Sequence, residues 1–158
     1  MRYCILISLL SLFLENICNI YLSSFKYFIP LFTILSLIFA YPFLKNEKKY
    51  YLLYSFFLGL VYDLFFTNFY VLNSIIFLLC SYFIYHIFKR FDYNVISVIL
   101  TTIFVIFFYN ALCFCILNFF LYTNYSLLEF SVILRYFFVL NLIYSTIMYL
   151  FTKVIWNK

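Results

Sequence analysis

Six long apolar segments, separated by short polar joints, restrict how this chain of 158 residues can fold. A helix needs about 20 predominantly apolar residues to cross roughly 30 Å of hydrocarbon. Only 9% of the residues are charged and 69% are hydrophobic, whereas a soluble domain has about 25% charged residues. The sequence therefore predicts an all-α fold, a polytopic membrane helix bundle of about six transmembrane helices that forms one integral membrane domain over residues 1–158. The expected spans are residues 3–24, 27–44, 51–67, 70–88, 95–122 and 130–152.

The joints between these segments predict how consecutive spans are arranged. Every joint is short, so neighbouring spans are expected to be antiparallel. The joint between the third and fourth spans, residues 66–69, is almost uncharged. It indicates either a helical hairpin or a pair of spans of which one stops short of the far surface.

The basic residues predict the orientation, because cytoplasmic loops carry an excess of Lys and Arg. With the N-terminus inside, eight basic residues lie on the cytoplasmic side, and two, Lys26 and Arg135, lie on or near the outer side. We therefore expect both termini to be cytoplasmic. The net charge of +5 has the same origin, so it indicates contact with the lipid bilayer and no nucleic-acid binding.

The sequence contains none of the usual catalytic constellations. It has no G-x-S-x-G, no H-E-x-x-H and no Gly-rich phosphate loop, and His86 is its one histidine. Intramembrane proteolysis would need paired aspartates or a Ser/His dyad, yet Asp63 is the single aspartate within a span. We therefore predict that the protein is not an enzyme and that it has no cofactor and no metal site.

Gly59, the only glycine of the chain, precedes Asp63 by one helical turn in a run that is otherwise apolar and aromatic. A carboxylate that faces lipid costs about 2.5 to 3.5 kcal/mol even on a lenient insertion scale, so Asp63 is expected to face other helices or a wet cavity. The bare backbone at Gly59 lies on the same face and lets a neighbouring helix approach closely. This pair indicates helix assembly rather than catalysis.

Two acidic residues and one basic residue are expected at a common level in the outer half of the bilayer. At about 1.5 Å per residue, Glu15 and Asp63 each lie roughly 18 Å above the cytoplasmic edge, and Arg135 lies roughly 22 Å above it. We therefore predict an intramembrane ion pair between Arg135 and either Asp63 or Glu15, since opposite charges offset part of each other's desolvation. Two alternatives remain open: Arg135 extends to the outer headgroups, or it pairs with a carboxylate of a partner protein.

The end of the third span and the start of the fourth resemble the signature of the MreD rod-shape-determining family. In that family a glycine and an aspartate one turn apart end one span, and a short turn leads to a Leu-Gly-Leu-Asn-like start of the next. The residues that match this pattern are Gly59, Asp63, Leu72 and Asn73. The family's glycines in the turn and before the Leu-Asn step are replaced here by Asn68 and Val71.

The resemblance implies a fold and a function that composition alone does not. It implies a non-enzymatic scaffold subunit of the cell-wall elongation complex, a multi-pass protein of the bacterial plasma membrane. The expected partners are an MreC-like protein, an MreB-like filament, a RodA-like protein and a class B penicillin-binding protein. Members of the family are also similar in fold to the substrate-binding subunits of energy-coupling-factor vitamin transporters.

A vitamin-binding transporter subunit is the alternative function. It predicts a solvent-lined pocket among the outer loops, where this chain offers few polar groups beyond Asn124, Ser126 and Glu129. It also predicts stripes of small residues for docking an energising module, but the chain has only two alanines, Ala40 and Ala111. The scaffold is therefore the favoured interpretation.

Overall fold

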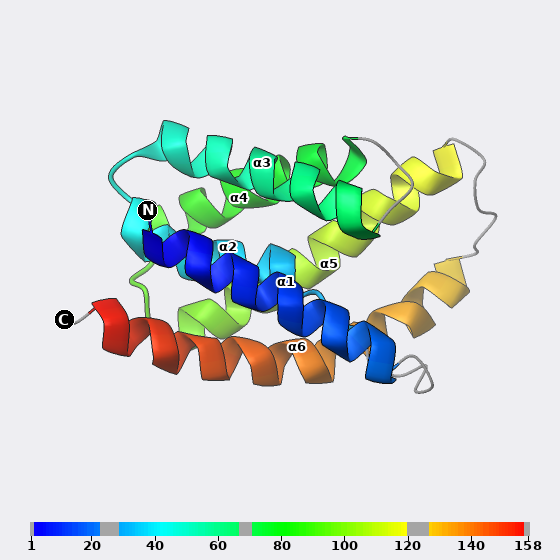
Figure 1. Cartoon of the computed structure of the whole chain (residues 1–158). Helices are drawn as coiled ribbons and strands as arrows, with labels where there is room; N and C mark the ends of the chain where they lie inside the picture. Colours follow the sequence, from blue (N-terminus) through cyan, green and yellow to red (C-terminus); the bar gives the residue numbers. More distant parts are fainter. Residues whose placement is uncertain (1, 23–28, 67–70, 120–126, 157–158) are drawn as a thin grey trace.

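The computed structural model describes residues 2–22, 29–66, 71–119 and 127–156, and these ranges contain six α-helices and no strand (Figure 1). The predicted all-α bundle is thus confirmed. The helices are α1 (Arg2–Leu22), α2 (Phe32–Leu44), α3 (Lys48–Phe66), α4 (Leu72–Arg90), α5 (Val95–Phe119) and α6 (Leu127–Trp156).

Most helix boundaries agree with the apolar segments of the sequence, and α2 is the exception. The apolar run predicts a start at residue 27, whereas α2 begins at Phe32. The residues just before it, Ile29 to Leu31, are not helical, and Leu31 has a φ of −131°. This helix has 13 residues, which corresponds to a length of about 20 Å.

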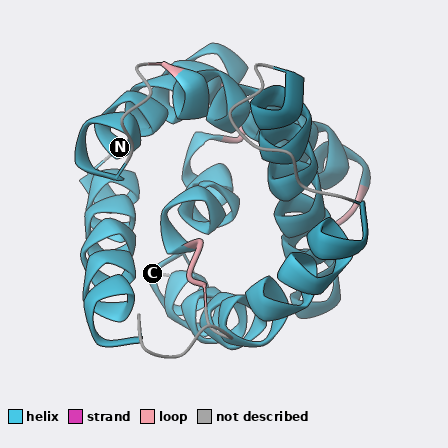
Figure 2. Ribbon diagram, turned by 90° about the vertical axis from the view of Figure 1, so that its right-hand side faces the viewer, coloured by secondary structure: helices cyan, strands magenta, loops and turns pink. Residues whose placement is uncertain are grey.

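Helix α2 lies at the centre of the bundle. It packs against all five other helices, and every residue from Phe32 to Leu44 except Phe43 is buried. Figure 2 shows one helix enclosed by the others, and these contacts identify it as α2. A helix that is hydrophobic on all sides is stable only in such a position. Since protein rather than lipid surrounds α2, it does not have to match the full thickness of the bilayer.

Four helices are long and apolar enough to cross a membrane: α1, α4, α5 and α6. Helix α3 has 19 residues but carries Lys48, Lys49 and Asp63. It packs along α4 more extensively than any other pair of helices does, so the two form an antiparallel hairpin. This packing agrees with the helical hairpin predicted for the joint between the third and fourth spans.

The described basic side chains gather at one end of the bundle, with Arg135 as the exception. Figure 1 shows both chain ends at this end, together with the α2–α3 and α4–α5 connections. The ammonium group of Lys48 lies 4.7 Å from the centre of the Tyr82 ring on α4. The basic residues at this end are Arg2, Lys45, Lys48, Lys49, Lys89, Arg90 and Lys153. Lys26, predicted on the opposite side, lies outside the described residues.

Candidate functional site

Gly59 is the point of closest approach between α3 and α4. A Cβ atom added to Gly59 would lie 2.5 Å from the Cα of Ser74, 2.8 Å from the carbonyl oxygen of Asn73 and 2.9 Å from the amide nitrogen of Ser74. All three atoms belong to the backbone of α4, so no side-chain rotation can relieve the clash. The α3–α4 hairpin therefore requires glycine here, as the sequence predicts for a close helix contact.

Asp63 lies one turn further along α3 and caps the first turn of α4. Its Oδ1 atom accepts hydrogen bonds from the Asn73 amide nitrogen at 3.2 Å and from Asn73 Nδ2 at 2.8 Å. Its Oδ2 atom accepts from the Ser74 amide nitrogen and from Ser74 Oγ, both at 3.2 Å. The first N–H groups of a helix have no partner within the helix and carry a partial positive charge. The Asp63 carboxylate gives these N–H groups acceptors and faces the positive end of the helix. These contacts explain how the Asp63 side chain can be only 4% exposed.

Asn73 extends this arrangement to a third helix. Its Oδ1 atom accepts a hydrogen bond of 2.9 Å from the hydroxyl of Tyr109 on α5. Leu72, the first residue of α4, is half-buried and packs against the core. We call Gly59, Asp63, Asn73 and Ser74 the hairpin contact. The structure thus brings the four predicted motif residues together, and it adds Ser74 and Tyr109, which the sequence interpretation missed.

Glu15 on α1 has the same role at the start of α2 as Asp63 has at the start of α4. Its carboxylate is fully buried. One oxygen accepts from the Thr33 amide nitrogen at 2.7 Å, and the other accepts from the Tyr62 hydroxyl at 2.9 Å. Since Tyr62 directly precedes Asp63 on α3, the two caps are adjacent. A polar layer therefore crosses the apolar interior from α2 through α1 and α3 to α4 and α5.

Asn141 on α6 completes this layer. Its Oδ1 atom accepts from the Leu31 amide nitrogen at 2.8 Å, and its Nδ2 atom donates to the Ile29 carbonyl oxygen at 2.9 Å. Non-helical backbone inside a membrane protein needs such partners, because lipid offers none. Nothing local to Asn141 in the sequence marks which backbone groups it reaches.

Serine hydroxyls hold α1 against its neighbours, and sequence reasoning missed them as well. Ser8 shares a hydrogen bond of 2.9 Å with Ser36 on α2 and a second one with Tyr54 on α3. Ser11 shares a hydrogen bond of 2.5 Å with the hydroxyl of Tyr144 on α6. In a chain with almost no glycine or alanine, serine takes the place of the small residue at helix contacts.

Arg135 is not part of this polar layer. Its side chain is exposed on α6, whereas Glu15 and Asp63 are buried with the partners described above. Among the described residues, the predicted ion pair with Asp63 or Glu15 is therefore not formed. Depth along a helix predicts the level of a side chain but not the direction in which it points. An exposed position fits both remaining alternatives, extension toward the headgroups and pairing with a carboxylate of a partner protein.

The polar layer is suited to holding helices rather than to reacting. Both carboxylates are occupied by the starts of helices, and no cluster of three or more His, Cys, Asp or Glu residues that could hold a metal ion is found in the described ranges. Asn124 and Ser126, considered for a vitamin pocket, lie outside the described residues, as does the side chain of Glu129.

Comparison with known proteins agrees with this arrangement. A family model, described as rod shape-determining protein MreD, matches residues 1–158, the whole length of the chain. No curated protein and no solved structure matches the chain. Three of the residues that resemble the family signature, Gly59, Asp63 and Asn73, belong to the hairpin contact, and the fourth, Leu72, directly precedes Asn73. Because the match covers the entire sequence, the chain belongs to the MreD family of rod shape-determining proteins.

Proposed function

We propose that the protein is a non-enzymatic scaffold of the cell-wall elongation complex in the bacterial plasma membrane. Membership of the MreD family implies a role in rod shape determination. In our proposal the helix bundle docks an MreC-like protein, and also a RodA-like protein and a class B penicillin-binding protein. Its basic cytoplasmic end contacts the inner leaflet or an MreB-like filament.

The observation that carries this proposal is the hairpin contact. Gly59 brings α3 so close to α4 that no side chain fits between them, and Asp63 joins the two helices by four hydrogen bonds. Such a contact fixes the distance and the angle between α3 and α4, and so the relative position of their outer faces. Those faces carry large exposed apolar side chains, among them Phe57, Leu64 and Ile75. In a bilayer, partner helices recognise one another by packing of this kind, so a fixed surface is what a scaffold needs.

Replacing Gly59 with Leu tests the scaffold. The side chain would collide with the backbone of Asn73 and Ser74 and push α4 away, while the apolar character of α3 and its membrane insertion would be kept. We expect loss of rod shape in a rod-shaped host that depends on this protein. We also expect at least a tenfold fall, on the order of 1.4 kcal/mol, in co-purification of the MreC-like partner.

The matched control is Phe107→Leu, which places the same side chain at an exposed position of α5, away from the outer faces of α3 and α4. It should leave shape and co-purification unchanged. Normal rods and intact co-purification with Gly59→Leu, at normal membrane levels, would reject the proposal.

The vitamin-transporter alternative receives no support from the comparison with known families. The matching family model names rod shape determination and not transport. A binding measurement with free vitamin and the purified protein distinguishes the two functions. High-affinity binding would favour the transporter subunit, whereas the scaffold predicts no binding.

A further inference from the structure

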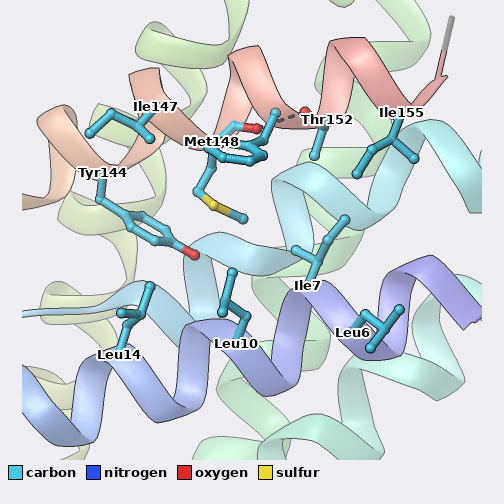
Figure 3. Close-up of a pocket in the computed structure, with 10 residues that line it drawn as sticks. Leu6, Ile7, Leu10, Leu14, Tyr144, Ile147, Met148, Thr152 and Ile155 are labelled. Atoms are coloured by element: carbon cyan, nitrogen blue, oxygen red, sulfur yellow. Dashed lines mark hydrogen bonds between the residues drawn. The ribbon is translucent and has the colours of Figure 1, made fainter.

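An apolar groove runs between α1 and α6 on the outside of the bundle. It has a volume of about 440 Å³, and Figure 3 shows side chains from both helices facing each other across it. Leu6, Leu10 and Leu14 line it from α1, and Ile147, Phe151 and Ile155 line it from α6. Neither the hairpin contact nor the polar layer uses this groove.

The groove wall offers no unsatisfied polar group to a ligand. Its two polar side chains are Tyr144 and Thr152. The Tyr144 hydroxyl is bonded to Ser11 Oγ, and Thr152 Oγ1 donates to the Met148 carbonyl oxygen at 2.9 Å. A polar molecule would lose its water there without gaining hydrogen bonds, so the occupant must be apolar along its length.

The size of the groove distinguishes between apolar occupants. A cavity of about 150 Å³ holds one benzene molecule, so a groove about three times larger has room for a segment of an acyl chain that follows its length. The groove extends along α1 from Leu6 to Leu14, which is about 12 Å of helix. A partner helix 10 Å in diameter needs about 900 Å³ over that length. The volume therefore fits a single acyl chain and is about half of what a helix needs.

The position of the groove matches one leaflet of the bilayer. It begins about one turn from the start of α1 and extends about 12 Å inward, close to the 15 Å or so that half of the hydrocarbon core measures. Arg2 is exposed and stands four residues before Leu6, so it lies on the same face of α1, at the mouth of the groove. A phosphate at Arg2 would place the attached acyl chain at the groove.

We propose that the α1/α6 groove binds one acyl chain of an anionic phospholipid of the inner leaflet, with the lipid phosphate at Arg2. The bound chain fills the space beside the Ser11–Tyr144 hydrogen bond that joins the two helices. It thereby completes the packing of α1 against α6. This inference is independent of the scaffold function proposed above.

Native mass spectrometry of the purified protein tests the proposal, after reconstitution into nanodiscs of equal parts phosphatidylglycerol and phosphatidylcholine. We expect one retained phosphatidylglycerol per chain. Leu10→Trp combined with Ile147→Trp fills the groove and should lower retention at least tenfold. The control combines Phe13→Trp and Leu150→Trp, exposed positions of the same helices outside the groove, and should match the native protein. Arg2→Gln should reduce the preference for the anionic lipid about fivefold.

Equal retention by the filled and native proteins would overturn the proposal, and so would retention of both lipids without preference. A photoreactive side chain at position 10 gives a second measurement that needs no groove-filling variant. Crosslinking in cells should yield a phospholipid adduct at position 10. A protein adduct there would mean that a partner helix occupies the groove, which would also overturn the proposal.

Discussion

Val71 has a φ of 75°, a left-handed conformation that β-branched side chains rarely adopt. It occupies the position before the Leu-Asn step, where the family pattern has glycine. A left-handed residue other than glycine costs about 1–2 kcal/mol, although glycine loses more conformational entropy on folding. Val71→Gly should therefore raise the free energy of unfolding by up to about 1 kcal/mol, or the melting temperature in detergent by about 2–4 °C.

The control for this prediction is glycine at Ile75, an exposed position inside α4. The φ of Ile75 is negative, so the substitution relieves no strain and should cost about 1 kcal/mol. A higher free energy of unfolding with Val71→Gly and a lower one with Ile75→Gly would establish that the gain at position 71 comes from its backbone conformation. Equal losses would show that Val71 is not strained.

The carboxylate of Glu15 and the guanidinium of Arg135 are expected to differ in their contribution to stability. Glu15→Leu removes both acceptor oxygens, so the Thr33 N–H and the Tyr62 hydroxyl lose their buried partner. We expect a loss of about 1–3 kcal/mol. Arg135→Gln changes an exposed side chain and should alter stability by about 0.5 kcal/mol or less.

Thermal unfolding of both variants, followed by circular dichroism, measures this difference. A large loss with Arg135→Gln would revive the ion pair that depth along the helices predicts. The charge-exchanged protein, with Arg135→Glu and Asp63→Arg, should then regain what each single variant loses.

At the scale of the helices, the start of α2 depends on a residue more than 100 positions away in the sequence. Asn141 bonds the Leu31 N–H and the Ile29 carbonyl, neither of which belongs to a helix. Asn141→Leu keeps a similar volume but leaves both groups unsatisfied, so we expect a loss of about 1–3 kcal/mol. Amide hydrogen exchange at Leu31 and Phe32 should also become at least tenfold faster.

Asn110→Leu is the matched control for that variant. Asn110 is also buried, but it donates to the Ile106 carbonyl of its own helix, which already belongs to a helical ladder. Its replacement should have little effect on exchange near α2. Similar exchange in the two variants would mean that Asn141 does not hold the start of α2.

Helix existence was predictable from the sequence, whereas the start of α2 was not. Apolar runs must become helices in lipid, because every backbone group needs a partner. Five helices accordingly start within about three residues of their apolar segments. At α2 the partners are Glu15 and Asn141, side chains from other helices, so the apolar run continues through residues that are not helical.

The candidate site was predictable in part, for a similar reason. Gly59 and Asp63 stand out because a lone glycine and a lone carboxylate are costly or unusual in an apolar helix. Asn73 and Leu72 were found through the family resemblance. The direction in which Arg135 points was not predictable, because spacing along a helix does not give its rotation about its own axis. Ser74 and Tyr109 carry no signal that separates them from the many other serines and tyrosines.

At the scale of the whole molecule, the distribution of charge determines how the bundle sits in the membrane. Seven described basic residues gather at the end that holds both chain termini, and Arg135 lies away from it. Anionic lipids and the positive-inside rule favour that end on the cytoplasmic side. The same orientation puts Arg2 at the inner leaflet, where the lipid proposed for the α1/α6 groove would reside.

Two reporters fused after Lys158 test this orientation. Green fluorescent protein, which folds in the cytoplasm, should fluoresce there, and alkaline phosphatase, which is active only outside, should stay inactive. The same reporters placed after Asn124, in the joint before the sixth span, should give the reverse pattern. Since a bundle with an even number of crossings returns its termini to one side, an active phosphatase at Lys158 would mean either an inverted bundle or an odd number of crossings. An epitope tag placed before Met1 separates these two cases, because inversion puts both ends of the chain outside whereas an odd number of crossings leaves the tag before Met1 inside.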